Sequence, residues 1–214
     1  MPAIRRFIKD PFCGISHWVG VALSIAALVV LLILAEGRPW HVVGFALYGT
    51  SLIVLYTASA LAHSLHCSPE TEQKLDRFDF AAIFALIAGT YTPLCLVTLR
   101  GPMGWFLLSA EWALAAVGIL IVTLSKSRRD RLRPMMYLAM GWLVVLAVPA
   151  LTVLPAGAIA WLIAGGVAYS VGAVIYVLDR PHIIRGYFHA HDLWHTLVLV
   201  GSTCHFMVML LYVA

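Results

Sequence analysis

The run PMMYLAMGWLVVLAVPALTVLPAGAIAWLIAGGVAYSVGAVIYVL, residues 134–178, contains no Asp, Glu, Lys or Arg. A helix needs about 20 apolar residues to cross ~30 Å of hydrocarbon. These 45 residues are therefore too long for one spanning helix and suit two. Pro155, Ala156 and Gly157 supply turn-forming residues between the two halves. The run thus predicts two membrane spans, and it decides between six and seven spans for the chain.

The composition predicts a membrane protein along the whole length of the chain. Of 214 residues, 62% are hydrophobic and only 11% are charged, whereas soluble domains contain about 25% charged residues. Backbone groups in lipid must bond internally, so long apolar runs become helices. We predict an all-α polytopic protein, a single domain over residues 1–214 with seven transmembrane helices. The helices are expected at residues 17–35, 40–66, 78–99, 103–124, 134–152, 155–178 and 190–213.

The distribution of Lys and Arg predicts the orientation, because cytoplasmic loops collect these residues. With the N-terminus inside, the cytoplasmic segments hold twelve Lys and Arg residues and the outer loops hold only Arg38 and Arg100. We therefore expect a cytoplasmic N-terminus and an external C-terminus. The basic start MPAIRRFIKD resembles the beginning of a signal peptide. The apolar run after it is too long and lacks a small-residue cleavage site, so we expect a true span.

Histidine and aspartate gather at the cytoplasmic ends of three expected helices. Ser59 and His63 lie near the end of the second helix, Asp79 lies near the start of the third, and His191 and His195 lie at the start of the seventh. His191 and His195 are four residues apart and so share one helical face. With His63 they could supply three nitrogens to a zinc ion. Asp79 would lie close enough to hold the water or to orient a ligand.

Simpler interpretations apply to the remaining polar residues. A histidine at a membrane interface is usually a wetted polar side chain, which is how we interpret His17, His41, His182 and His189. The four cysteines contain no CxxC pair and are interpreted as small core residues: Cys13, Cys67, Cys95 and Cys204. Glu111 lies inside the fourth expected helix, where a carboxylate is costly, but the sequence offers no partner for it. His205 is too deep to join the same ion, and we expect it to bond a neighbouring helix or to line a cavity.

Three segments together resemble a known family. SALAHSLH (59–66), LDRFDFAAIFALIAGTYTP (75–93) and HDLWHTLVLVGSTCHF (191–206) resemble the hemolysin III family, which belongs with the adiponectin and progestin receptors in a larger seven-helix group. The resemblance covers nearly the whole chain and suggests the bacterial branch, and hence the bacterial inner membrane. This sequence departs from common members at Ala62, where Tyr often stands, and at Asp192, where Glu is frequent.

The resemblance also implies roles for particular residues. In the adiponectin receptors three histidines bind zinc and an aspartate holds the zinc-bound water. Those roles fall on His63, His191, His195 and Asp79, and Ser59 matches the helix 2 serine of the family. We therefore place Zn²⁺ on the three histidines and group Asp79 with Ser59 as catalytic residues. The adiponectin receptors are associated with hydrolysis of ceramide, a lipid amide.

The first functional hypothesis is a zinc-dependent hydrolase of lipid amide or ester bonds, with membrane lipids as partners, an acyl lipid as substrate and no nucleic acid. A second is an intramembrane metalloprotease, because HDLWH approximates HExxH with Asp192 in the place of Glu. A third is a receptor, stress-signalling or membrane-lytic protein with a structural zinc. Structural sites normally use a fourth protein ligand, and His66 or Asp79 could supply it.

Overall fold

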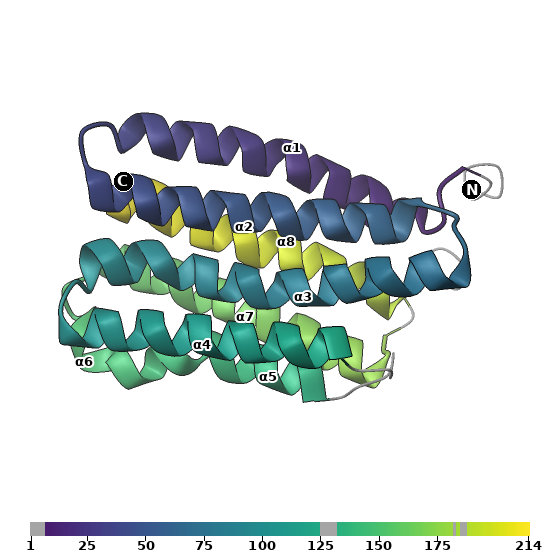
Figure 1. The fold of residues 1–214 in the computed structure, drawn as a ribbon. Helices are drawn as coiled ribbons and strands as arrows, with labels where there is room; N and C mark the ends of the chain where they lie inside the picture. The colour runs from purple at the N-terminus through teal and green to yellow at the C-terminus, as the bar shows by residue number, and fades with distance from the viewer. Residues whose placement is uncertain (1–6, 125–131, 182, 185–187) are drawn as a thin grey trace.

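The computed structural model describes residues 7–124, 132–181, 183–184 and 188–214. These residues form a bundle whose helices run roughly along one axis, with the two ends of the chain at opposite ends of the bundle (Figure 1). Seven helical stretches are long and apolar enough to cross a membrane. The helices are α1 (Pro11–Leu34), α2 (Pro39–Ser64), α3 (Pro69–Pro93) with its π-helical continuation Leu94–Thr98, α4 (Pro102–Leu124), α5 (Leu132–Gly141), a 3₁₀ segment (Leu143–Ala147), α6 (Val148–Leu151), α7 (Ala156–Leu178), and α8 (Ala190–Val208) with its π-helical continuation Met209–Val213.

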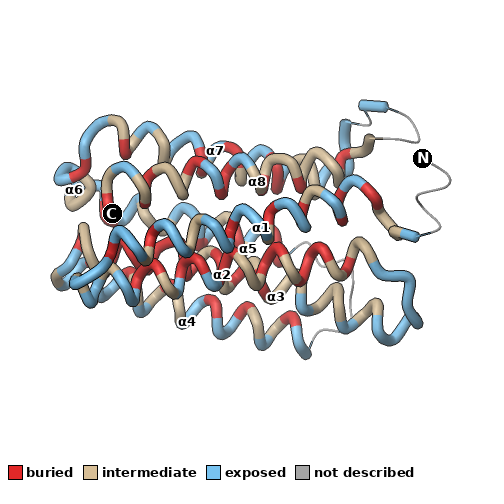
Figure 2. Tube along the Cα trace, turned by 90° about the horizontal axis from the view of Figure 1, so that it is seen from above, coloured by how far each residue is buried: buried red, intermediate tan, exposed pale blue. Residues whose placement is uncertain are grey.

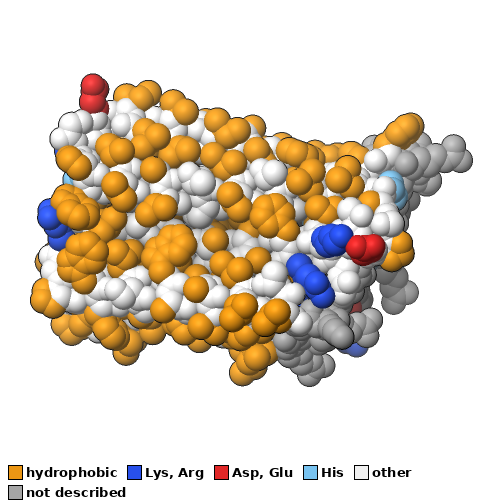
Figure 3. Space-filling model, viewed as in Figure 1, with side chains coloured by type: hydrophobic (Ala, Val, Ile, Leu, Met, Phe, Trp, Pro, Cys, Tyr) orange, Lys and Arg blue, Asp and Glu red, His pale blue; other side chains and the backbone are white. Residues whose placement is uncertain are grey.

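The prediction of an all-α fold with seven spans is confirmed. The flank of the bundle in Figure 3 is covered with hydrophobic side chains, and the charged side chains lie toward its two ends. The buried residues lie on the inward faces of the helices and the exposed ones face outward (Figure 2). A surface of this kind is stable only against lipid, so the protein is an integral membrane protein.

Some residues singled out in the sequence lie outside the described residues. Among those on which the orientation was predicted, these are Arg5, Arg6, Lys126, Arg128, Arg129, Arg131 and Arg185, and His182 lies outside as well.

Two helices begin earlier than the sequence predicted. The first begins at Pro11 instead of residue 17, and the third begins at Pro69 instead of residue 78. Proline at the first helical position needs no hydrogen-bond partner for its nitrogen and already has a helical φ. Before Pro69, Ser68 caps the helix by accepting a hydrogen bond from the Thr71 backbone N–H. The prediction therefore located the later part of each helix and missed its first turns, which are polar in α3.

The fifth span, expected as one helix over 134–152, is broken into three helical pieces. Pro149 is one cause, because it has no N–H and its ring excludes the carbonyl of the preceding turn. Tyr91 of α3 compensates for the break: its hydroxyl lies 3.0 Å from the Met140 carbonyl oxygen and 2.9 Å from that of Gly141. The same oxygen accepts a hydrogen bond from the Val144 backbone N–H at 2.9 Å. One side chain thus satisfies backbone groups that hydrocarbon could not.

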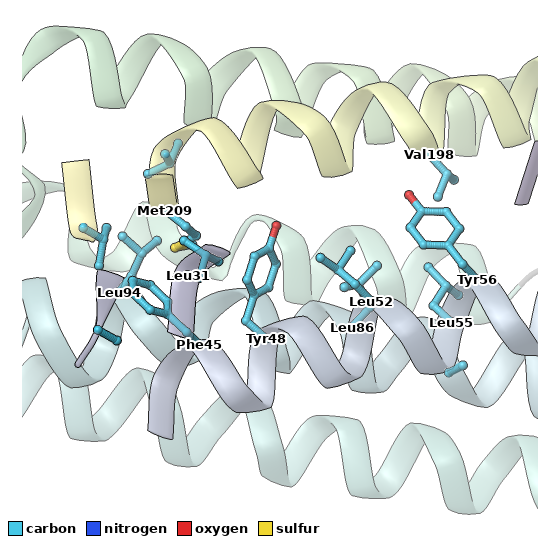
Figure 4. Packing of buried hydrophobic residues seen from close by; sticks show 14 of the residues in the cluster. Leu31, Phe45, Tyr48, Leu52, Leu55, Tyr56, Leu86, Leu94, Val198 and Met209 are labelled. Carbon is cyan, nitrogen blue, oxygen red and sulfur yellow. The ribbon is translucent and has the colours of Figure 1, made fainter. Parts of the chain in front are cut away.

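The core lies along α2, which packs against α1 and α3. Phe45, Tyr48 and Leu52 of α2 are almost wholly buried and lie between Leu86 of α3 and Met209 in the last turn after α8 (Figure 4). Hydroxyl groups add directional contacts to this apolar packing: Tyr56 of α2 donates to Ser202 of α8 at 2.7 Å, and Tyr169 of α7 lies 2.8 Å from the same Ser202 oxygen. These contacts link α2, α7 and α8 at one level along the bundle.

The connections of the bundle bring four helix ends together near the N-terminus. The starts of α1, α3 and α8 and the end of α2 all lie at this end in Figure 1. The residues that were singled out on the second, third and seventh expected helices therefore lie at one end of the bundle, as the topology required.

Close packing of α3 against α4 makes a prediction about stability. A methyl group on Gly118 of α4 would lie 2.3 Å from the Phe84 ring, which is fully buried. We expect Gly118→Ala to destabilise the protein by about 1–3 kcal/mol, because the ring has no free space to move into. The measurement is thermal unfolding of the detergent-purified protein. Gly141→Ala is the matched control, since nothing lies within 4 Å of its added methyl group; equal melting temperatures for both variants would contradict the packing argument.

Candidate metal centre

Three imidazole rings meet at the N-terminal end of the bundle. The Nε2 atom of His191 lies 2.9 Å from Nε2 of His195 and 3.5 Å from Nε2 of His63. His191 and His195 lie one turn apart at the start of α8, and His63 lies in the last turn of α2. The i, i+4 spacing seen in the sequence is thus completed by a ring from a helix more than 120 residues away in the chain. Three ring nitrogens converge on one point.

The outward nitrogens of two of these rings are held by hydrogen bonds. Nδ1 of His63 lies 3.0 Å from a carboxylate oxygen of Asp10, and Nδ1 of His195 lies 3.0 Å from a ring nitrogen of His17. The hydrogen bond with His63 lowers the pKa of Asp10, so its carboxylate is charged at neutral pH. Outer partners of this kind orient the rings of metal-binding histidines and raise their basicity. His63 and His195 are therefore turned with Nε2 toward the centre.

Cys13 completes the cluster: the sequence correctly predicted a buried cysteine, but it did not indicate that this cysteine lies beside the three histidines. One ring nitrogen from each of the three histidines and the Cys13 Sγ atom all lie within 4.8 Å of one another. Cys13 is 1% exposed, so it is buried as expected, but among ligating atoms as well as core residues. His17, interpreted as a wetted interface residue, is also buried and contacts His195. The signal for both lies in the sequence: Cys13 and His17 are four residues apart in the first turns of a helix that begins at the same end of the bundle.

The donor set fits a metal ion. Nitrogens bound to zinc at ~2.0–2.1 Å in a tetrahedron lie about 3.4 Å apart, close to the separations of 2.9 and 3.5 Å between these ring nitrogens. Imidazole and thiolate ligands suit zinc and other transition metals better than calcium or magnesium. The group could therefore hold a metal ion, and its residue types allow more than one identity for that ion.

Asp79 and Ser59 lie on the wall of a cavity beside the histidines. The cavity has about 40 Å³ of space for water-sized molecules, and His17, His191 and His195 also line it. Such a volume exceeds the ~10–15 Å³ needed to hold one water molecule. The Ser59 hydroxyl is a hydrogen-bond partner of Asp79. Neither residue belongs to the group of four converging ligand atoms, so both face the space next to the cluster.

A second, apolar cavity of about 100 Å³ adjoins the first. The two cavities share a wall of apolar and aromatic side chains: Leu55, Ile83, Tyr137, Trp194 and Val198. His205 lines this second cavity, and it also interacts with the backbone of Leu162 on α7. Both alternatives that the sequence left open for His205 therefore apply. An apolar space thus lies next to the polar site, on the other side of this shared wall.

Three other residues considered from the sequence have different surroundings. Asp192 accepts a hydrogen bond from the His189 backbone N–H at 2.8 Å and another from the Cys13 thiol at 3.1 Å. Its carboxylate therefore caps α8 and holds Cys13, which argues against the general-base role that a metalloprotease would require. His66 is exposed beyond the end of α2. Glu111 is fully buried in α4, and neither carboxylate oxygen has a hydrogen-bond partner among the described residues.

The chain is similar to known proteins over nearly its whole length. A family model described as haemolysin-III related matches residues 5–206. The chain is 39% identical to Hemolysin-3 of Bacillus cereus, over 100% of this chain and 96% of that protein. It is 41% identical to a Hemolysin-3 homolog of Bacillus subtilis strain 168, over 96% of this chain and 95% of that protein.

The geometry predicts that metal binding depends on the α8 pair. We expect the protein, purified without chelator, to contain about one metal ion per chain, and the double variant His191→Ala/His195→Ala to contain none, because removing two ligands leaves an incomplete site. Elemental analysis of the purified proteins measures this. His41→Ala, at the opposite end of α2, is the control and should keep its metal. Equal metal content in the double variant and the wild type would refute the assignment.

Proposed function

The chain belongs to the haemolysin-III-related family, and we propose that it is a zinc-dependent hydrolase of lipid amide or ester bonds. The observation that carries this proposal is the position of Asp79 and Ser59 on the wall of one cavity with His191 and His195. A proton-transfer group thus lies next to the candidate metal ligands, with space for water between them.

Each residue of the candidate site has its own role in the proposed reaction. His63, His191 and His195 would hold the zinc ion, which when bound supplies Lewis acidity toward a carbonyl oxygen and a water molecule. The Asp79 carboxylate would accept a proton from the attacking water and deliver it to the leaving amine or alcohol. Ser59 would hold Asp79 in position through its hydrogen bond.

The substrate class follows from the second cavity. Leu55, Ile83 and Val198 line both spaces, so an acyl chain among them would place its carbonyl carbon near the polar cavity. Apolar walls with a few converging polar groups are typical of sites for small apolar ligands. This arrangement supports a lipid with an acyl tail better than a soluble substrate.

Asp79 provides the direct test of this proposal. We expect Asp79→Asn to reduce turnover of acyl-amide or acyl-ester lipids about 10²–10⁴-fold, because the amide cannot accept the proton, and to leave the metal content unchanged. Release of fatty acid from a panel of such lipids by the zinc-loaded protein measures this effect. Asp76→Asn, one turn away on α3, is the matched control and should remain active. If the zinc-loaded wild type releases fatty acid from no lipid in the panel, the hydrolase proposal fails.

We further propose that the site faces the cytoplasmic leaflet of the bacterial inner membrane, as the Lys and Arg distribution predicts. Cys67 allows a direct test, because it is an exposed thiol at the same end of the bundle as the site, whereas Cys13, Cys95 and Cys204 are buried. A membrane-impermeant maleimide should label the protein in inside-out vesicles and leave it unlabelled in intact spheroplasts. Cys67→Ser should abolish the labelling. Labelling in intact spheroplasts would reverse the proposed orientation.

Cys13 favours a second candidate function, a receptor or signalling protein with a structural metal ion. Structural zinc sites have four protein ligands, whereas catalytic sites keep one position for water. The cluster contains four candidate ligands. For this candidate, removing the metal with a chelator should lower the melting temperature, and no lipid should be hydrolysed in the presence of zinc.

A further inference from the structure

The thiol of Cys13 is directed at the histidine cluster from a third helix. Its Sγ atom lies within 4.8 Å of a ring nitrogen of His63, His191 and His195, and the residue is 1% exposed. The thiol donates a hydrogen bond to Asp192 at 3.1 Å, which fixes the side chain beside the first turn of α8. Cys13 is thus part of a cluster drawn from α1, α2 and α8.

The start of α1 is held firmly against the end of α2. The Asp10 backbone N–H donates to the His63 carbonyl oxygen at 2.8 Å, and that of Lys9 donates to the Ser64 carbonyl oxygen at 3.3 Å. Gly14 packs so closely that a Cβ atom there would lie 2.7 Å from Oγ of Ser64. The position of Cys13 therefore follows from the backbone hydrogen bonds before it and from the close packing of Gly14 after it.

We propose that Cys13 is the fourth protein ligand of the metal ion, so that the resting site is closed by a thiolate. This inference rests on the metal binding in the proposed function and adds a regulatory step to it. The thiolate is the form of cysteine that binds metals, and three histidines with one cysteine make a complete four-coordinate set. The Sγ proton is released when a metal binds, and the hydrogen bond from the thiol to Asp192 is given up in that step.

The consequence concerns access to the site. The cavity with Asp79 adjoins His191 and His195, whereas Cys13 is not among its lining residues. Cys13 therefore approaches the histidines from outside this cavity. With the thiolate in place all four positions are filled, and water or a substrate carbonyl gains a position only when Cys13 withdraws.

Cobalt substitution in the purified full-length protein tests the inference without reference to activity. Bound Co²⁺ gives visible absorption bands with any ligands, and a thiolate ligand adds a strong charge-transfer band in the near ultraviolet. We expect both features in the wild type, and we expect Cys13→Ser to keep the visible bands and to lose the ultraviolet band. Cys95→Ser is the matched control, because Cys95 is equally buried but lies outside the cluster; it should keep both.

The outcomes separate this inference from the proposed function. Visible bands without the ultraviolet band in the wild type would overturn the role of Cys13 and leave the three-histidine site standing. If the wild type binds no Co²⁺ and no zinc, both proposals fail. X-ray absorption of the zinc-loaded wild type gives a test that does not depend on the folding of a variant: a sulfur at about 2.3 Å beside nitrogens at about 2.0–2.1 Å is expected, and a shell without sulfur would overturn the inference.

Discussion

Hydrocarbon offers no hydrogen-bond partner to a backbone amide or to a polar side chain, and the architecture of this protein depends on that constraint. It turns each apolar run into a helix and favours arrangements in which polar groups inside the bundle find partners within the protein. The break in the fifth span shows how this works in detail. The α-helical hydrogen bonds stop where α5 gives way to the 3₁₀ segment, and the hydroxyl of Tyr91 from another helix contacts carbonyl and amide groups at that break.

The same constraint explains the histidine cluster. Imidazole rings on α2 and α8 are largely shielded from solvent and contact one another, and the outer nitrogens of His63 and His195 are held by Asp10 and His17. Rings held at their outer nitrogens present their inner nitrogens at one point, which is the arrangement that a metal ion requires. A network built to satisfy buried polar groups thus also provides a set of ligands. The neighbouring cavity with Asp79 and Ser59 adds a place where water can meet that set.

Glu111 is an exception to this pattern of paired polar groups. It is fully buried in α4, and its two carboxylate oxygens have no hydrogen-bond partner among the described residues. It lies near Tyr91 and Cys95, the first of which serves the broken fifth span. Its burial at this place is unusual for a membrane helix.

The sequence by itself determined the number of spans, because that number follows from the lengths of charge-free runs and the thickness of a bilayer. It also brought His63, His191 and His195 to one end of the bundle, because their depth depends only on where each helix starts and ends. Only the tertiary structure decided that their rings meet, that Cys13 and His17 join them, and that Asp192 caps α8. The physical reason is rotation: the direction in which a side chain leaves its helix, and the helix it then faces, depend on how side chains pack between helices. Hydropathy carries no information about that packing, since the lipid-facing and buried faces of these helices are nearly equally apolar.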